Sequence, residues 1–231
     1  MMTGRTVSLT FATRTGTTQE NVTINECVVA GWTGRDQAAL EKHIRELEEL
    51  GVKRPATTPI FYRVSAARLT TDTAIEAVGT ASSGEVEYAL LQHNGRLWVG
   101  VGSDHTDREA ETYGVTVSKQ MCDKPIATTF WPVDEVAGHW DSLILRSYII
   151  ENGARVLYQE GALAGMLSPA DLIARYTDGG QLRDGTLMFC GTFAAKGGIR
   201  PAARFDYQIA DETLQRTIES GYDIVTLPIL G

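Results

Sequence analysis

The sequence predicts a single α+β domain that is rich in β-strands. Short runs of Val, Ile, Thr, Phe and Tyr recur along the chain and are separated by Gly, Pro and Asn-Gly turns. Residues 36–51 form the clearest amphipathic helix. With 231 residues and no repeat or linker, the chain 1–231 is expected to fold around one core, with a small N-terminal β unit (1–35), this helix, and a main body over 60–231.

The N-terminal unit is expected to be a hairpin. Thr6–Phe11 and Asn21–Ala30 alternate β-branched or aromatic residues with polar ones around a Thr/Gly-rich turn. This alternation is typical of strands with one buried face.

The helix over 36–51 has both end signals. Asp36 is a suitable N-cap, and Gly51 a suitable stop. Its apolar residues recur every three or four positions. They are Leu40, Ile44, Leu47 and Leu50.

The rest of the chain is expected to contain mostly strands. Pro55 and Pro59 favour an extended passage into a strand at Ile60–Val64. A short helix over 168–174 and a buried strand over 185–193 are also predicted. Asn-Gly favours two-residue hairpin turns. Two hairpins are therefore expected, Glu85–Leu91 with Arg96–Val101 around Asn94-Gly95, and Leu143–Ile150 with Arg155–Gln159 around Asn152-Gly153.

Composition argues against several partners. The net charge is -8, from 29 acidic and 21 basic residues, and there is no Lys/Arg-rich run. We therefore do not expect nucleic acid or acidic membranes as partners. A small polar molecule is the expected partner. The three cysteines, Cys27, Cys122 and Cys190, are widely spaced and indicate reduced thiols. We see no apolar leader and no run near the ~20 residues that a bilayer requires, so we expect a soluble cytoplasmic protein.

Three carboxylates form the most informative pattern. Glu85 and Glu87, at i and i+2 on a strand, project to one face, and Asp104 follows on the next strand. Carboxylate oxygens are the ligands of hard divalent cations. The competing interpretation is a solvated acidic face, which is common on half-exposed strands.

The motifs around these residues resemble those of the fumarylacetoacetate hydrolase superfamily. Ser103–Glu109 is similar to the family's N-D-x-T-A-R-D, with Ser103 in place of Asn and Glu109 in place of the final Asp. Leu182–Thr192 is similar to L-x-x-G-D-x-I-x-x-G-T, and Asn152-Gly153 with Gln159 to N-G-x-x-x-Q. The resemblance runs from about Ala30 onward and indicates a divergent subgroup of unassigned activity.

The resemblance implies a fold and a cofactor. The fold would be a mixed β-roll whose sheets wrap a central site, with the helix over 36–51 as a lid and a homodimeric assembly. Glu85, Glu87 and Asp104 would bind a divalent cation, most often Mg²⁺, with Mn²⁺ or Ca²⁺ as alternatives. Lys119 would stabilise developing oxyanion charge.

The resemblance also implies substrate contacts. Arg108 would bind a substrate carboxylate or orient a metal ligand, and Gly191-Thr192 would contact the substrate carboxylate. One departure concerns the substrate: Glu111 stands where the family commonly has Gln, so it either faces away or changes the substrate preference.

A histidine and a glutamate on the helix could activate water. His43 and Glu46 resemble the H-x-x-E of the family's lid helix, and i, i+3 spacing places them on one face. A carboxylate raises the basicity of imidazole, as a general base requires. The alternative is an exposed pair on an amphipathic helix.

Together these features predict a metal-dependent hydrolase or lyase. It would cleave a C–C bond of a 2-oxo or 1,3-dioxo carboxylate through a metal-stabilised enolate. A first alternative is decarboxylation, hydration, dehydration or tautomerisation of a 2-oxo acid at the same site. A second is a non-catalytic binding protein that the metal merely stabilises.

Overall fold

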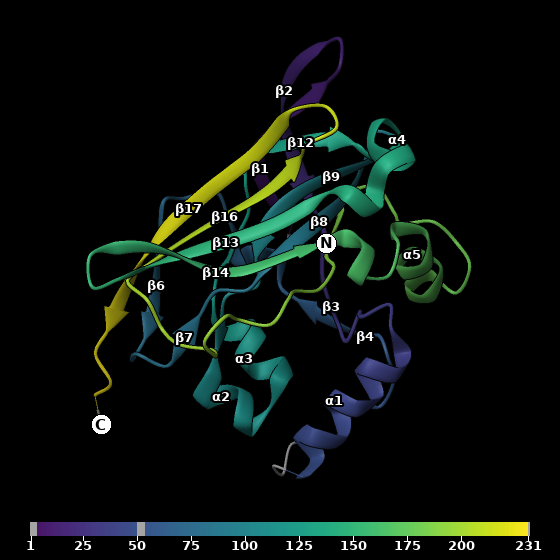
Figure 1. The fold of residues 1–231 in the computed structure, drawn as a ribbon. Coiled ribbons are helices and arrows are strands. Elements are labelled where there is room, and N and C mark those ends of the chain that lie inside the picture. Colours follow the sequence, from purple (N-terminus) through teal and green to yellow (C-terminus); the bar gives the residue numbers. More distant parts are fainter. Residues whose placement is uncertain (1–3, 50–53, 231) are drawn as a thin grey trace.

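Two sheets packed face to face form the body of the protein (Figure 1). The computed structural model describes residues 4–49 and 54–230. The larger, mixed sheet has the order β2 (Gly16–Ile24), β1 (Arg5–Thr13), β12 (Thr129–Pro132), β9 (Arg96–Ser103), β8 (Val86–His93), β15 (Thr186–Phe189), β3 (Glu26–Gly31) and β4 (Ile60–Val64). The smaller has the order β14 (Ala154–Ala162), β13 (Ile144–Glu151), β16 (Arg204–Asp211), β17 (Arg216–Leu227) and β6 (Ala74–Val78).

Short strands and helices close the ends of the sheets. Two two-stranded ladders pair β7 (Ser82–Ser83) with β10 (Thr106–Asp107) and β5 (Leu69–Thr70) with β11 (Lys124–Pro125). The α-helices are α1 (Gln37–Glu49), α2 (Arg108–Tyr113), α3 (Val115–Met121), α4 (Val133–Val136) and α5 (Pro169–Thr177). The 3-10 turns are η1 (Ala66–Arg68), η2 (Ala137–Ser142) and η3 (Leu163–Gly165).

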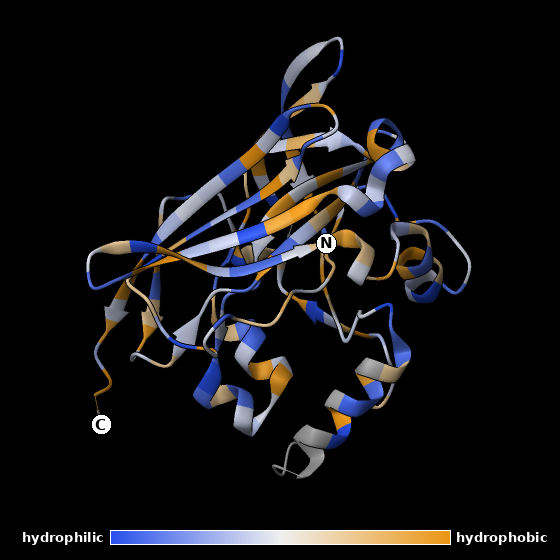
Figure 2. Cartoon of the chain, viewed as in Figure 1, coloured by the Kyte–Doolittle hydropathy of each residue, from blue (hydrophilic) through white to orange (hydrophobic). Residues whose placement is uncertain are grey.

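Two apolar clusters lie on opposite faces of the larger sheet. The first fills the space between the sheets, where β8 packs against β13 and β16, and β9 packs against β16 and β17; Tyr88 and Val101 are among its buried residues. The second includes residues from β1 and β2 at one end of the larger sheet and from β3 and β4 at the other. A single cluster can join both ends because the sheet curls around it. In Figure 2 the hydrophobic residues gather on the central strands, whereas α1 carries both kinds.

The predicted strand-rich α+β class is confirmed, as are the main local elements. Both Asn-Gly hairpins form, with Asn94 and Asn152 at φ 51° and 50° followed by glycines at positive φ. The backbone N–H of Ala38 donates to Asp36 Oδ1 at 2.9 Å, so Asp36 begins α1 as predicted. The predicted stop at Gly51 lies outside the described residues.

Three predicted elements need correction. Asn21–Ala30 is not one strand: it divides at Asn25, whose N–H donates to Gly185 O at 2.8 Å. As a result β2 completes the hairpin at one edge of the sheet, and β3 lies near the other edge, between β15 and β4. The strand over 185–193 ends at Phe189. Glu85 precedes β8 rather than lying within it.

None of the described helices is long and apolar enough to cross a membrane.

The close packing of the larger sheet yields a prediction about Gly100. A Cβ at this position would lie 2.7 Å from the ring of Phe130, which is fully buried. We expect Gly100→Ala to lower the free energy of unfolding by about 1–3 kcal/mol, because the buried ring has little room to move. Urea denaturation measures the change. Gly138→Ala is the control, since no heavy atom lies within 4 Å of its Cβ position; equal effects of the two substitutions would contradict the prediction.

Candidate metal centre

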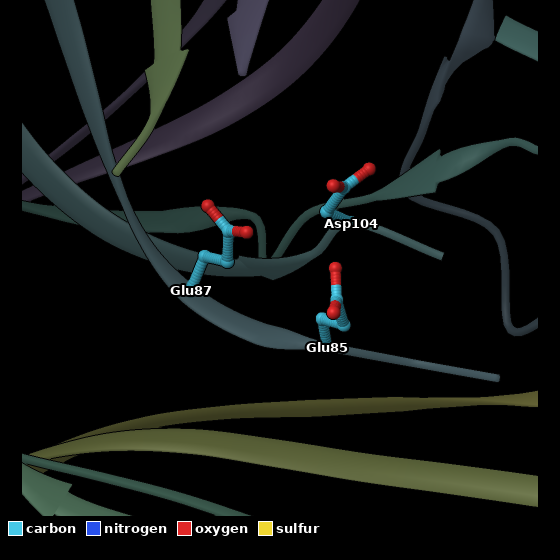
Figure 3. A group of neighbouring side chains, drawn as sticks. All are labelled: Glu85, Glu87 and Asp104. Atoms are coloured by element: carbon cyan, nitrogen blue, oxygen red, sulfur yellow. The ribbon is translucent and has the colours of Figure 1, made fainter. Parts of the chain in front are cut away.

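Strand pairing brings the three predicted carboxylates together. β8 and β9 are antiparallel, so the start of β8 lies beside the end of β9, and the N–H of Asp104 donates to Glu85 O at 3.0 Å. Glu87 lies on the same face of β8 as Ala89 and Leu91, at the edge of the second apolar cluster. Figure 3 shows the three carboxylates converging from two neighbouring segments.

The triad of Glu85, Glu87 and Asp104 is compact and mostly buried. One carboxylate oxygen of each lies within 4.8 Å of one from each of the others. Glu87 is 2% exposed and Asp104 0%, while the side chain of Glu85 is 16% exposed. The interpretation as a solvated acidic face is therefore wrong.

Two lysines hold Asp104 as an anion. Lys119 Nζ donates to Asp104 Oδ2 and lies 3.6 Å from Glu85, and Lys124 Nζ lies 3.0 Å from Asp104 Oδ1. Burial alone would raise the pKa of Asp104, but the two ammonium groups lower it to about 2. Burial would lower the pKa of Lys119, yet Asp104, Glu85 and Glu87 raise it. Asp104 and Lys119 are therefore both charged at neutral pH.

Lys124 is the residue of this site that the sequence analysis missed. It is fully buried, and its ammonium also donates to His105 O at 2.6 Å. The available signal was a lone lysine in the apolar run that begins at Lys124-Pro125-Ile126-Ala127. A lysine in such a run is rarely buried without a carboxylate partner.

Glu87 lacks such a strong partner. Its Oε2 accepts a 2.7 Å hydrogen bond from the N–H of Gly191. Burial, followed by the charges of Asp104 and Glu85, raises its pKa well above 4.5, and Lys119 and the Gly191 N–H offset this only in part. Glu87 is thus the carboxylate of the triad that would gain most from an added cation.

The predicted Gly191-Thr192 segment lies at the site but uses its polar groups internally. Gly191 has φ 100° and a Cβ there would collide with Thr33, so the close approach requires glycine. Thr192 Oγ1 donates to Val86 O and accepts from Gln159 Nε2, both at 2.8 Å. A contact between Thr192 and substrate stays a prediction.

Gln159 ties the sheets together beside the triad. Its Oε1 accepts from the N–H of Val86 at 3.0 Å and from Ser147 Oγ at 2.9 Å. Its Nε2 donates to Phe193 O at 2.6 Å as well as to Thr192. All four hydrogen-bonding positions of this buried amide are used.

Arg108 contacts the site through Glu85. Its Nη2 lies 3.2 Å from Glu85 Oε1, its Nη1 donates to Glu111 Oε2 at 3.0 Å, and its Nε donates to Ser83 Oγ at 2.8 Å. Glu111 therefore does not face away: it pairs with Arg108. The arrangement fits orientation of a metal ligand, while contact of Arg108 with a substrate carboxylate stays a prediction.

The predicted His43 and Glu46 lie on α1, but their side chains are outside the described part of the structure.

A cavity of about 1050 Å³ lies between η2 and α5, away from the triad. Trp140, Asp141 and Ile173 are among its lining residues, and no carboxylate of the triad lines it.

The donor set fits a divalent cation. Three carboxylate oxygens at this spacing match the all-oxygen ligation of Mg²⁺, Mn²⁺ or Ca²⁺. Two further observations fit a cation here. Among the described residues Asp104 Oδ1 has no partner in hydrogen-bond geometry, although Lys124 is close, and burial together with the neighbouring carboxylates disfavours the ionised form of Glu87 in the absence of a cation. The group could therefore bind a divalent cation.

The raised pKa of Glu87 predicts a pH dependence of stability. A carboxyl whose pKa is higher in the folded than in the unfolded protein contributes its full stability below the unfolded pKa, near 4.5, and loses it as the pH rises through the folded pKa. In chelator-treated protein, Glu87→Gln should therefore be more stable than wild type at about pH 8, and the advantage should shrink toward about pH 5. Thermal denaturation across this range measures it.

The control is Glu109→Gln, which removes one negative charge from an exposed position. If Glu87→Gln lowered stability at every pH, or if Glu109→Gln gave the same pH profile, the prediction would be wrong.

Solved structures share the fold of this protein. The structure is similar to that of the protein Cg1458, with a TM-score of 0.63, 12% identity, and coverage of 96% of this chain and 100% of the other. It is also similar to 2-keto-3-deoxy-D-arabinonate dehydratase complexed with magnesium and 2,5-dioxopentanoate, with a TM-score of 0.61, 17% identity, and coverage of 88% and 74%. A search of curated protein sequences found no match.

These similarities establish the fold, and it is the fold that the resemblance to the fumarylacetoacetate hydrolase superfamily predicted. A family model described as "Protein of unknown function (DUF2848)" matches residues 30–222. The chain therefore belongs to the DUF2848 family, on a fold shared with the fumarylacetoacetate hydrolase superfamily.

Proposed function

We propose that the protein is a divalent-cation-dependent enzyme that acts on a 2-oxo carboxylate by stabilising the enolate derived from it. The observation that carries this is the buried triad of Glu85, Glu87 and Asp104 with Lys119 beside it. A fold shared with a dehydratase solved with magnesium and a dioxo acid supports the substrate class.

The triad would hold the cation, with Mg²⁺ first and Mn²⁺ or Ca²⁺ as alternatives. The bound cation would supply positive charge where the oxo oxygen becomes negative. Gly191 fixes the Glu87 carboxylate through its N–H, and Arg108 fixes that of Glu85. These bonds hold the oxygens in place before anything binds, which lowers the cost of organising the site.

Lys119 would act on the substrate directly. Its side chain is 8% exposed and its ammonium remains protonated, so it would supply a buried positive charge to a developing oxyanion. Lys124 would keep Asp104 ionised when Lys119 turns to the substrate, because its own contact with Asp104 is independent.

The reaction we propose first is hydrolytic C–C cleavage of a 2-oxo or 1,3-dioxo carboxylate. In it His43, oriented by Glu46, removes a proton from water that attacks the distal carbonyl. The electrons of the broken C–C bond form the enolate, and a proton returned to carbon completes the product.

The alternative at the same site is a 2-oxo acid dehydratase, decarboxylase or tautomerase that needs no attacking water. The fold shared with a dehydratase supports this alternative. Both reactions share the enolate, so they differ in the role of His43.

Calorimetry tests the shared part of this proposal. Mg²⁺ or Mn²⁺ is titrated into chelator-treated protein with and without oxalate, whose two carboxylates mimic an enolate with its adjacent carboxylate. We expect oxalate to bind with a dissociation constant in the micromolar range only when the metal is present, and Glu85→Ala to abolish this binding.

Glu109→Ala is the matched control and should bind oxalate like wild type. If oxalate did not bind in a metal-dependent way, the enolate function would be refuted. Metal-dependent thermal stabilisation without oxalate binding would instead support a non-catalytic, metal-stabilised protein.

The variant His43→Ala separates the two reactions. With acetylpyruvate as a 1,3-dioxo probe, it should lose C–C hydrolysis by at least about a hundredfold, while deuterium exchange at C3 of 2-oxobutyrate, followed by NMR, should persist. Lys42→Ala, at a neighbouring exposed position, should retain both. Hydrolysis that survived in His43→Ala would remove the dyad from the mechanism.

A further inference from the structure

Arg108 is the most exposed of the three cationic side chains around the triad, at 17% against 8% for Lys119 and 0% for Lys124, but its charge is already matched. All three nitrogens of its guanidinium contact protein oxygens, on Ser83, Glu85 and Glu111. A carboxylate ligand binds arginine best through two parallel N–H bonds from one edge of the guanidinium. Three of the five N–H donors of Arg108 are therefore engaged, and Glu85 and Glu111 already balance its charge.

The charges around the triad leave room for one more negative charge beside a divalent cation. The network contains four carboxylates, Glu85, Glu87, Asp104 and Glu111, and three cations, Arg108, Lys119 and Lys124. Fully ionised, it carries one negative charge, and a divalent cation changes this to one positive charge. A substrate with a single carboxylate makes the site neutral.

Other donors beside the triad are also engaged. The N–H of Gly191 is bonded to Glu87, the hydroxyl of Thr192 to Val86 O, and both N–H groups of Gln159 to Thr192 and Phe193. A second carboxylate on the substrate would therefore have to displace an existing bond to obtain a donor from any of these residues. Burying it without one is costly.

We propose that the substrate is a 2-oxo monocarboxylate whose distal part is uncharged, and that Glu111 sets this preference by neutralising Arg108. The inference rests on the proposed function and extends it from the reacting end of the substrate to its other end. Oxalate is consistent with it, because its two carboxylates are adjacent and both lie at the cation, whereas a distal carboxylate needs a separate positive partner.

The test uses two acids of the same chain length. 2-Oxopentanoate and 2-oxoglutarate differ only in the distal methyl or carboxylate. Each is titrated against the magnesium-bound protein in competition with oxalate, so the readout is binding and does not depend on turnover. In wild type, 2-oxopentanoate should bind on the order of tenfold more tightly than 2-oxoglutarate.

Two variants assign the preference to Glu111. Glu111→Gln removes its charge, leaves Arg108 without a carboxylate from α2, and should reduce the ratio of the two affinities by on the order of tenfold. Glu109→Gln removes a charge from an exposed residue of the same helix and should leave the ratio unchanged.

The outcomes separate this inference from the proposed function. One outcome is that oxalate binds with magnesium but 2-oxopentanoate competes no better than 2-oxoglutarate. This outcome, which includes the case in which neither acid competes, overturns the inference and leaves the enolate site standing. An unchanged ratio in Glu111→Gln would remove Glu111 as the cause. If oxalate itself does not bind, both fall together. The wild-type ratio decides the substrate class even if a variant fails to fold.

Discussion

Enclosure of the Asp104 carboxylate between two ammonium groups is the interaction on which the rest of the site depends. A fully buried carboxylate is costly unless it is paired, and Lys119 and Lys124 provide a charge on each oxygen. Since Asp104 is fixed as an anion, its charge then acts on Glu87 and contributes to the raised pKa there. The triad is therefore asymmetric: Asp104 is held as an anion, whereas the raised pKa of Glu87 favours its neutral form.

The curl of the larger sheet explains why such a group can exist inside a domain of this size. The strand alternation of β8 that places Ala89 and Leu91 in the second apolar cluster also directs Glu87 toward it. Gln159, on β14 of the other sheet, bonds to the start of β8 and to the segment that follows β15. The apolar cluster excludes water on one side, and the amide network fixes the strand ends on the other.

Local signals in the sequence predicted much of this arrangement, and long-range contacts account for what they missed. Asn-Gly turns specify their hairpins through positive φ, and the E-x-E spacing specifies a common face, so both could be read from the chain. The strand break at Asn25 depends on a hydrogen bond to Gly185, and the burial of Lys124 depends on its ion pair with Asp104. Both partners are distant in the sequence, so only the fold reveals these contacts. The pairing of Arg108 with Glu85 also depends on the fold, because the two residues are brought together from separate segments of the chain. The homodimer and the His43–Glu46 pair remain predictions.

The position of α2 outside the curled sheet has a consequence for how the substrate preference of this fold could change. Glu87 belongs to a strand of the curled sheet, and Glu85 and Asp104 directly flank its strands, whereas Arg108 and Glu111 sit on a six-residue helix outside it, begun by Asp107 and ended at Gly114. Under the proposed function, substitutions in this short helix would alter which substrates bind and leave the carboxylates of the sheet unchanged. Residues for selectivity and residues for reactivity would then lie in separate stretches of the sequence.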